Sequence, residues 1–174
     1  MASFYTYLIS SLPMLHFGAR PPFSFEKFLL RCEGLIPQED FQVIKNLTRQ
    51  DTHKGPKAVI KKWLDFDTML RNELVKLRAS RKKIDPAKYL RPDGYAGSSF
   101  YHIALAAQRN PSPLEGERLL DIERWNFLEG ASFGHYFDSE FLIIYAYKLL
   151  ILERWERINS ADKNKILDET LAEH

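Results

Sequence analysis

The chain has 174 residues, a formal net charge of +2, 45% hydrophobic residues and 28% charged residues. These values are ordinary for a folded protein of one domain, or of two small ones. The single cysteine, Cys32, excludes an internal disulfide framework and a cysteine-based zinc site. Because it lies among leucines, we expect it to be a buried, inert thiol.

The N-terminus has no basic region before its apolar stretch, so it does not predict a signal peptide. The most apolar stretch, residues 141–152, has 12 residues and includes Lys148. A membrane span needs about 18 or more. We therefore predict a buried core helix here, no membrane insertion and a cytoplasmic protein.

The net charge hides an uneven distribution. Residues 54–91 carry 12 Lys and Arg against 4 Asp and Glu, a net +8. Residues 112–174 carry 7 against 13, a net −6. A basic middle and an acidic end can attract each other within the chain, or they can face different partners.

The sequence of the N-terminal third of the chain predicts three helices. For residues 2–12, helix is favoured slightly over strand. The second helix begins after Ser24, whose hydroxyl can accept a bond from a free backbone N–H, and it ends at Gly34. The third has Pro37 in its first turn, followed by acidic residues at the positive end of the helix dipole. One apolar side of this third helix comprises Phe41, Ile44 and Leu47.

Residues 57–80 form the longest amphipathic pattern, with apolar residues every three or four positions. Asp85 and Pro86 predict the start of a short helix that ends at Leu90. A stretch rich in proline and glycine follows, and it predicts a hinge near residues 91–98. We accordingly expect an N-terminal region, residues 1–91, and a C-terminal region, residues 92–174, although both could belong to one compact domain.

The C-terminal half predicts further helices. One spans residues 99–108 with Ser99 as its N-cap. Ser112, Pro113 and Glu115 form a capping-box signature for the next helix, which stops near Gly130. Asp138 or Ser139 caps the last long helix, and Ser160 or Asp162 starts a separate terminal one. Because strand signals are nearly absent, we predict an all-α protein, either a helical bundle or an array of helical hairpins.

Two of these helices carry one phrase twice, 30 residues apart. Residues 119–125 and 149–155 share five of seven positions, including Leu-Leu at the start and Glu-Arg-Trp at the end. Convergent packing explains this better than a duplicated hairpin, because the preceding seven residues do not repeat. The short connection predicts that Trp125 and Trp155 mark one antiparallel hairpin. We expect the second copy to be central and the first peripheral.

The sequence contains no recognisable catalytic motif. It lacks a phosphate-binding glycine loop, and its five histidines show no metal-binding spacing. We expect His102 to be a core or boundary residue and His135 to cap a helix end. A small enzyme would need one of these two histidines in a polar pocket with a carboxylate partner. We predict a non-catalytic protein with no cofactor, no metal and no small-molecule substrate.

A basic run closes the long helix at residues 57–80, where the helix dipole favours cations. A solvated helix end is the simplest explanation. The main functional alternative is contact with an acidic protein surface, followed by nucleic acid and then an anionic membrane surface. The candidate partner-contact residues are Lys76, Arg78, Arg81, Lys82 and Lys83.

Three segments, residues 4–15, 23–29 and 137–155, resemble an uncharacterised bacterial family whose genes lie among those for V/A-type ATP synthase subunits. Around these segments the resemblance extends over roughly residues 4–30 and 114–158. That family is distantly similar to the all-helical socket of V/A-type ATPases, known in eukaryotes as the d subunit, which joins the central rotor stalk to the membrane ring. The resemblance implies helical lobes and a non-catalytic role. The chain is much shorter than this socket protein and could supply only one or two of its lobes.

The resemblance thus implies an accessory or central-stalk protein that contacts V/A-type ATPase subunits. It implies a cytoplasmic location, peripheral to the membrane through a complex. The alternative is a helical adaptor for nucleic acid that uses residues 54–91, although nucleic acid is the less favoured partner.

Overall fold

The computed structural model describes the backbone of residues 2–48, 57–92 and 100–172, and the side chains of residues 5–48, 57–92 and 100–161. All regular elements in these ranges are helical, which confirms the predicted all-α class. The helices group into two compact units. Unit 1 combines residues 1–50 with 134–174, and unit 2 comprises residues 51–133.

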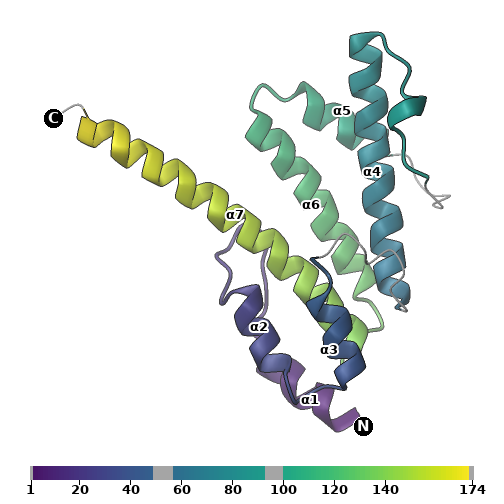
Figure 1. Ribbon diagram of the computed structural model, residues 1–174, viewed down its shortest axis with the longest axis vertical. Coiled ribbons are helices and arrows are strands. Elements are labelled where there is room, and N and C mark those ends of the chain that lie inside the picture. The colour runs from purple at the N-terminus through teal and green to yellow at the C-terminus, as the bar shows by residue number, and fades with distance from the viewer. Residues whose placement is uncertain (1, 49–56, 93–99, 173–174) are drawn as a thin grey trace. The chain divides into compact units, whose positions relative to one another are not determined.

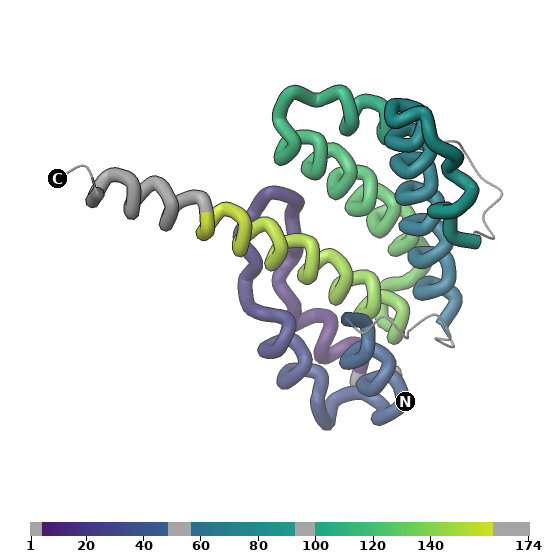
Figure 2. Tube along the Cα trace, turned by 45° about the horizontal axis from the view of Figure 1, so that its top comes forward, coloured from purple at the N-terminus to yellow at the C-terminus, as the bar shows by residue number. Residues whose placement is uncertain are grey.

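Unit 1 contains three short helices, α1 (Ala2–Ser11), α2 (Phe25–Cys32) and α3 (Gln38–Lys45), and one long helix, α7 (Ser139–Ala172). The α2 and α3 helices pack against each other and against α7, and Figures 1 and 2 both show them beside its N-terminal half. Residues 142–147 of α7 are all buried, so this part of the helix is the centre of the unit. The two copies of the repeated phrase do not differ in depth as predicted, because the first has Leu120, Asp121 and Trp125 buried and the second has Leu149, Ile151 and Leu152 buried, with Trp155 only partly buried.

An aromatic cluster joins α2 to α7. Tyr145 lies against the rings of Phe23, Phe28 and Phe141. Its hydroxyl donates a hydrogen bond to the carbonyl of Pro13 at 2.9 Å. Burial raises the pKa of Tyr145 to about 12. Because the one polar atom of this ring has a partner, the ring can be buried at little cost.

The predicted starts of α2 and α7 are confirmed, whereas Pro37 lies just before α3 rather than in its first turn. Ser24 Oγ accepts a bond from Lys27 N at 3.3 Å, and Gly34 follows α2 with a φ of +74°. At the start of α7, Asp138 Oδ1 accepts a bond from Phe141 N at 2.8 Å. Cys32 is fully buried, and its burial raises the pKa of the thiol to about 12, as expected for an inert cysteine.

Unit 2 is built from α4 (Ala58–Lys82), a single 3-10 turn η2 (Ala87–Tyr89), α5 (Tyr101–Arg109) and α6 (Pro113–Ala131). All three α-helices pack against one another. Phe66 of α4 is fully buried, stacked on Phe127 at 4.2 Å and edge-on to Phe100 at 5.1 Å between ring centres. The predicted cap of α6 is present, since Ser112 Oγ accepts a bond from Glu115 N.

A buried ion-pair network also ties α4 to α6. Arg124 Nε lies 2.9 Å from Asp67 Oδ1, and its Nη1 lies 2.8 Å from Asp121 Oδ1. Burial lowers the pKa of Arg124, but the two carboxylates more than offset this and raise it above its usual value. The network holds α6 against the middle of α4. The C-terminal end of α4 lies beyond it and lines the site described below.

Three predictions about the extent, pairing and grouping of the helices differ from the structure. The α7 helix continues through residues 160–162, so the separate terminal helix is wrong. Trp125 and Trp155 lie in different units, and each helix packs within its own unit rather than as one hairpin. The compact units also do not follow a division at residues 91–98, because α4 packs on α5 and α6 across that point. Residues 93–99, including the predicted cap Ser99, lie outside the described residues.

Candidate functional site

A cleft of about 630 Å³ lies within unit 2, at the C-terminal end of α4. Its walls come from α4, the turn after it, η2, the end of α5 and the start of α6. This volume falls in the range of about 300–1,000 Å³ that is usual for ligand sites. The cleft includes three of the five predicted partner-contact residues: Arg78, Arg81 and Lys82.

The floor of the cleft is apolar and closed. Leu74, Ala79, Ala107 and Leu120 line it, and all four are buried. The α5 and α6 helices touch here, because a Cβ placed on Gly116 would lie only 2.5 Å from the carbonyl oxygen of Ala107. The glycine therefore permits the close approach of the two helices at the cleft.

The rim carries exposed apolar groups, with Ile84 46% and Tyr89 54% accessible. Ile84 follows the α4 cap, at which Lys83 adopts a left-handed conformation with a φ of 54°. The Ile84 amide donates to the carbonyl of Ala79 at 3.1 Å, which folds the chain back over the helix end. Large apolar side chains left accessible together at a concave site are typical of a binding surface.

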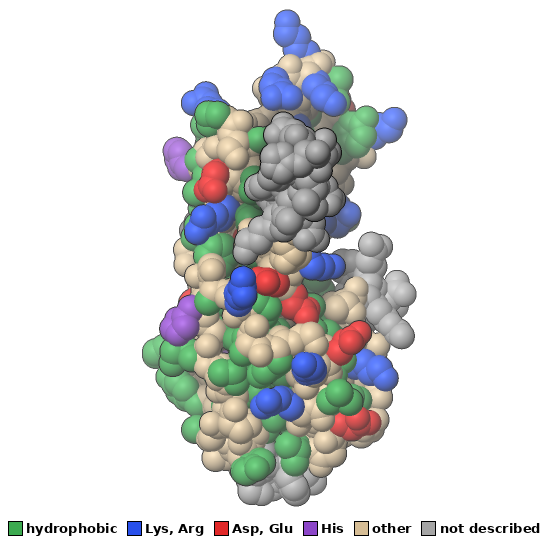
Figure 3. Space-filling view, turned by 90° about the vertical axis from the view of Figure 1, so that its left-hand side faces the viewer, with side chains coloured by type: hydrophobic (Ala, Val, Ile, Leu, Met, Phe, Trp, Pro, Cys, Tyr) green, Lys and Arg blue, Asp and Glu red, His purple; other side chains and the backbone are tan. Residues whose placement is uncertain are grey.

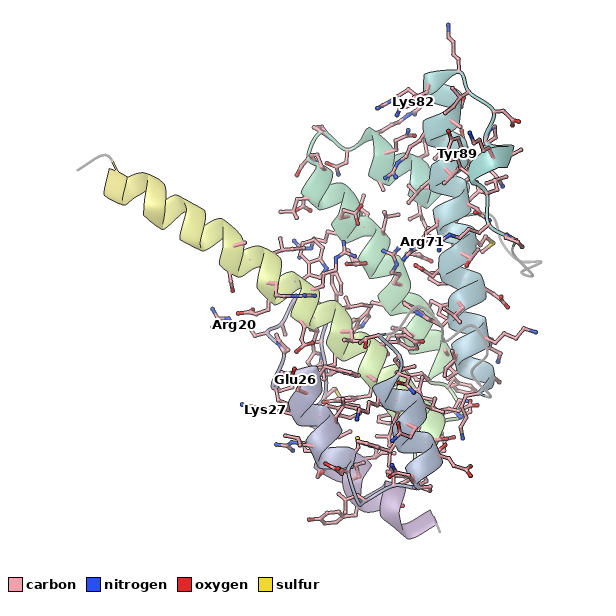
Figure 4. The ribbon with its side chains drawn as sticks, in the orientation of Figure 1. Arg20, Glu26, Lys27, Arg71, Lys82 and Tyr89 are labelled. Carbon is pink, nitrogen blue, oxygen red and sulfur yellow. The ribbon has the colours of Figure 1, made fainter. Side chains whose placement is uncertain are left out.

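A second tie holds the chain after Tyr89. The buried side chain of Asn72 on α4 bonds the backbone of Arg91, donating from Nδ2 to the carbonyl at 2.8 Å and accepting from the amide at 3.0 Å. In Figure 4, Lys82 and Tyr89 are labelled near this end of α4, with Arg71 farther along the helix. Arg71 is paired with Asp67 at 2.7 Å and lies outside the cleft lining.

Most of the cations at and beside the cleft have no ion pair with another described residue. All five predicted contact residues are exposed, and Figure 3 shows lysine and arginine side chains gathered at this end of unit 2. Lys76 pairs with Glu73 at 2.7 Å. Within the described ranges, the remaining four make no ion pair, and Glu117 is the one carboxylate among the lining residues. Repulsion among these unpaired cations is relieved when an anion binds.

The two candidate histidines lie elsewhere. His102 is exposed on α5, so its predicted core or boundary position is wrong; the apolar side of that short helix is covered through Ala104 and Ala107 instead. His135 is partly exposed, with Nδ1 2.6 Å from Asp138 Oδ2 and Nε2 2.9 Å from Glu140 Oε2. These two contacts hold the His135 ring beside the first turn of α7, where Asp138 caps the helix.

Because His135 has carboxylate neighbours, the hypothesis of a small enzyme stays a prediction. No set of three or more His, Cys, Asp or Glu side chains arranged to hold a metal ion occurs among the described residues. No helix in the described part of the chain combines the length and apolarity needed to cross a bilayer.

The chain is thus a helical protein with a cleft that has an apolar lining and several basic side chains. Comparison with protein families matches residues 99–171 to the model described as "Protein of unknown function (DUF2764)". This match covers α5, α6 and α7, less than half of the chain, and it includes the C-terminal region that resembles an uncharacterised family. The searches of curated proteins and of solved structures found no match.

Sequence reasoning identified the basic residues but missed the rest of the cleft. Tyr89, Ala107 and Gly116 come from three separate elements, and nothing in their local sequence indicates that they converge. The pair Ile84 and Tyr89 was the available signal, because both are large apolar residues in a segment otherwise rich in charge.

Proposed function

We propose that this protein is a non-catalytic accessory or stalk protein of a V/A-type ATPase, and that it works through protein contacts. The observation that carries the contact role is a set of four cations, Arg78, Arg81, Lys82 and Lys83, which lie beside accessible apolar groups and none of which has an ion pair with another described residue. The assignment to the ATPase rests on the sequence resemblance of residues 4–30 and 114–158 to a family encoded with its subunits.

Charge complementarity between partners speeds association and selects the correct one. A patch of four unpaired cations therefore favours an acidic surface on the partner. The apolar rim supplies the accessible area that such contacts bury for affinity. Binding through this surface is expected to weaken as salt rises, because exposed charges are screened within about 10 Å at 0.1 M.

The test is purification of the native protein from cells under conditions that keep the ATPase intact. We expect ATPase subunits to co-purify, and to be lost when the four cations are replaced by alanine. A variant that loses four exposed lysines elsewhere, Lys27, Lys45, Lys61 and Lys62, serves as the control with the same total charge. Recovery of the native protein without any ATPase subunit would contradict the proposal.

A nucleic-acid adaptor is the second candidate. The observation that favours it is the accessible ring of Tyr89, which lies near Lys88 with 6.0 Å from Nζ to the ring centre and provides a stacking surface beside the basic patch. Phosphate contacts weaken steeply with salt, so binding to single-stranded RNA or DNA is measured over about a tenfold span of salt, from roughly 20 to 200 mM. Absence of binding at the low end eliminates this candidate.

A further inference from the structure

The cations of the cleft lie along one edge at the spacing of a helical turn. Arg78 is followed by Arg81 and Lys82, at positions i+3 and i+4 of α4, so their Cα atoms rise about 4.5–6 Å along the helix axis. All three line the same cleft. Two negative charges on one ligand, about one helical turn apart, would match Arg78 at one end and the adjacent pair Arg81 and Lys82 at the other.

The same ligand must also cover apolar surface. Besides the three cations, the cleft is lined by the buried apolar residues Leu74, Ala107 and Leu120 and by the exposed apolar residues Ile84 and Tyr89. An inorganic anion would leave the apolar lining of the cleft in contact with water. A purely apolar ligand would leave the positive charges of the cleft without a counter-charge. Both features together require a ligand with an apolar face and an acidic edge.

We propose that the cleft binds an acidic amphipathic helix of a partner protein. Glutamates three or four residues apart on such a helix have Cβ atoms about 5–6 Å apart, and Arg78, Arg81 and Lys82 follow the same i, i+3 and i+4 spacing on α4. An apolar residue on the adjacent face enters the cleft and covers its floor, as in other complexes that bind a helix in a groove. The inference rests on the proposed contact function, and it specifies the chemistry of the partner segment.

The probe is a synthetic peptide of about four helical turns, with leucine on one face and glutamate at the i and i+4 positions beside it. One control peptide has lysine in place of glutamate, and another has serine in place of leucine. Binding to the full chain is measured by calorimetry, and its position by chemical-shift changes of backbone amides. We expect saturable binding of the acidic leucine peptide only, with shifts at Ile84, Tyr89 and Ala107.

The protein variants separate specific recognition from general attraction. Replacing Arg78, Arg81 and Lys82 with alanine removes three charges at the cleft, and replacing Lys27, Lys45 and Lys61 removes three exposed charges elsewhere. Losing three exposed ion pairs should weaken peptide binding by about tenfold or more. The control variant should bind within about twofold of the wild type. Ile84→Ser tests the apolar rim in the same way, with folding of each variant checked by circular dichroism.

The outcomes distinguish this inference from the proposed function. Equal binding of the acidic peptide to the two triple variants, or no saturable binding to the wild type, overturns the helix site even if ATPase subunits co-purify. Peptide binding at the cleft without ATPase association upholds the site and removes the proposed partner. If the serine peptide binds as tightly as the leucine peptide, the cleft is a simple anion site and the helix proposal is wrong. The proposal is also wrong if sedimentation shows that the protein self-associates and the cleft is blocked in that form.

Discussion

Asn72 satisfies both backbone polar groups of Arg91, although 19 residues separate them in the chain. The amide side chain is only 3% exposed, so it has little access to water as an alternative partner. The segment between them, which includes Ile84 and Tyr89, is thereby closed into a loop against α4. One buried side chain on a helix thus determines where the rim of the cleft lies.

Replacement of Asn72 with alanine should release this loop. Two hydrogen bonds are lost, and we expect the free energy of unfolding to fall by about 1–3 kcal/mol. Amide exchange at Tyr89 and Arg91 should speed up more than exchange in the middle of α4. Asn126→Ala, at an exposed position on α6, is the control. Unchanged exchange at Arg91 in Asn72→Ala would show that the loop is held by other contacts.

Two glycines of α6 should respond in opposite directions to alanine. At Gly116 the new methyl group meets the Ala107 backbone at 2.5 Å, and backbone cannot move aside as a flexible side chain can. We expect a loss of about 1–3 kcal/mol in unfolding free energy. At Gly130 nothing lies within 4 Å, so alanine should stabilise the helix by up to about 1 kcal/mol. Chemical denaturation of both variants provides the comparison, and a gain at Gly116 would refute the close helix contact.

The network around Arg124 should be far more sensitive than a surface pair. Arg124→Met removes the cation from beside Asp121, which is 1% exposed, and should cost about 2–4 kcal/mol of unfolding free energy. Arg118→Met breaks a 3.9 Å pair with Glu115 in which both side chains are about half exposed, and should cost less than about 0.5 kcal/mol. Similar losses in the two variants, measured by urea denaturation, would mean that the buried pair is weak.

Alkaline pH should destabilise unit 1. Burial raises the pKa of Cys32 from 9.0, and that of Tyr145 from 10.0, to about 12 in the folded chain. The unfolded chain therefore releases these protons first, so the contribution of these two groups to the free energy of unfolding is fully present below about pH 9 and is lost as pH rises towards 12. Urea midpoints at pH 8, 10 and 11 measure this fall. Tyr145→Phe should reduce the slope above pH 10, and an unchanged slope would rule out this tyrosine as a cause.

Most helices could be predicted from the sequence, because the ends of a helix are set by capping residues that lie only a few positions away in the chain. Ser24, Ser112 and Asp138 each accept a bond from an amide three residues ahead. The apolar side of residues 57–80 was likewise visible, since helical spacing alone places those side chains together. Such features need no knowledge of distant contacts.

The errors arose where a local signal competed with a longer-range effect. Ser160 and Asp162 resemble a helix start, but no proline or glycine interrupts the chain before them, and uninterrupted helix avoids losing backbone hydrogen bonds. The repeated phrase indicated a hairpin because only a short connection separates the copies. The grouping of helices around one core depends on the apolar faces of all of them. In this protein α6 packs against α4 and α5.

Unit 1 is assembled from both ends of the chain, with residues 51–133 inserted between them. During translation, α2 and α3 are therefore made before the α7 helix on which they pack. At about 5–20 residues per second, the intervening chain takes on the order of 5–20 s to synthesise. Throughout this interval Phe28, Phe41 and Ile44 lack the cover that α7 provides, whereas by its end α4, α5 and α6 have all been synthesised and can pack on one another. We expect unit 2 to acquire stable structure first on the ribosome, and the first three helices to be the segment of the nascent chain that chaperones bind.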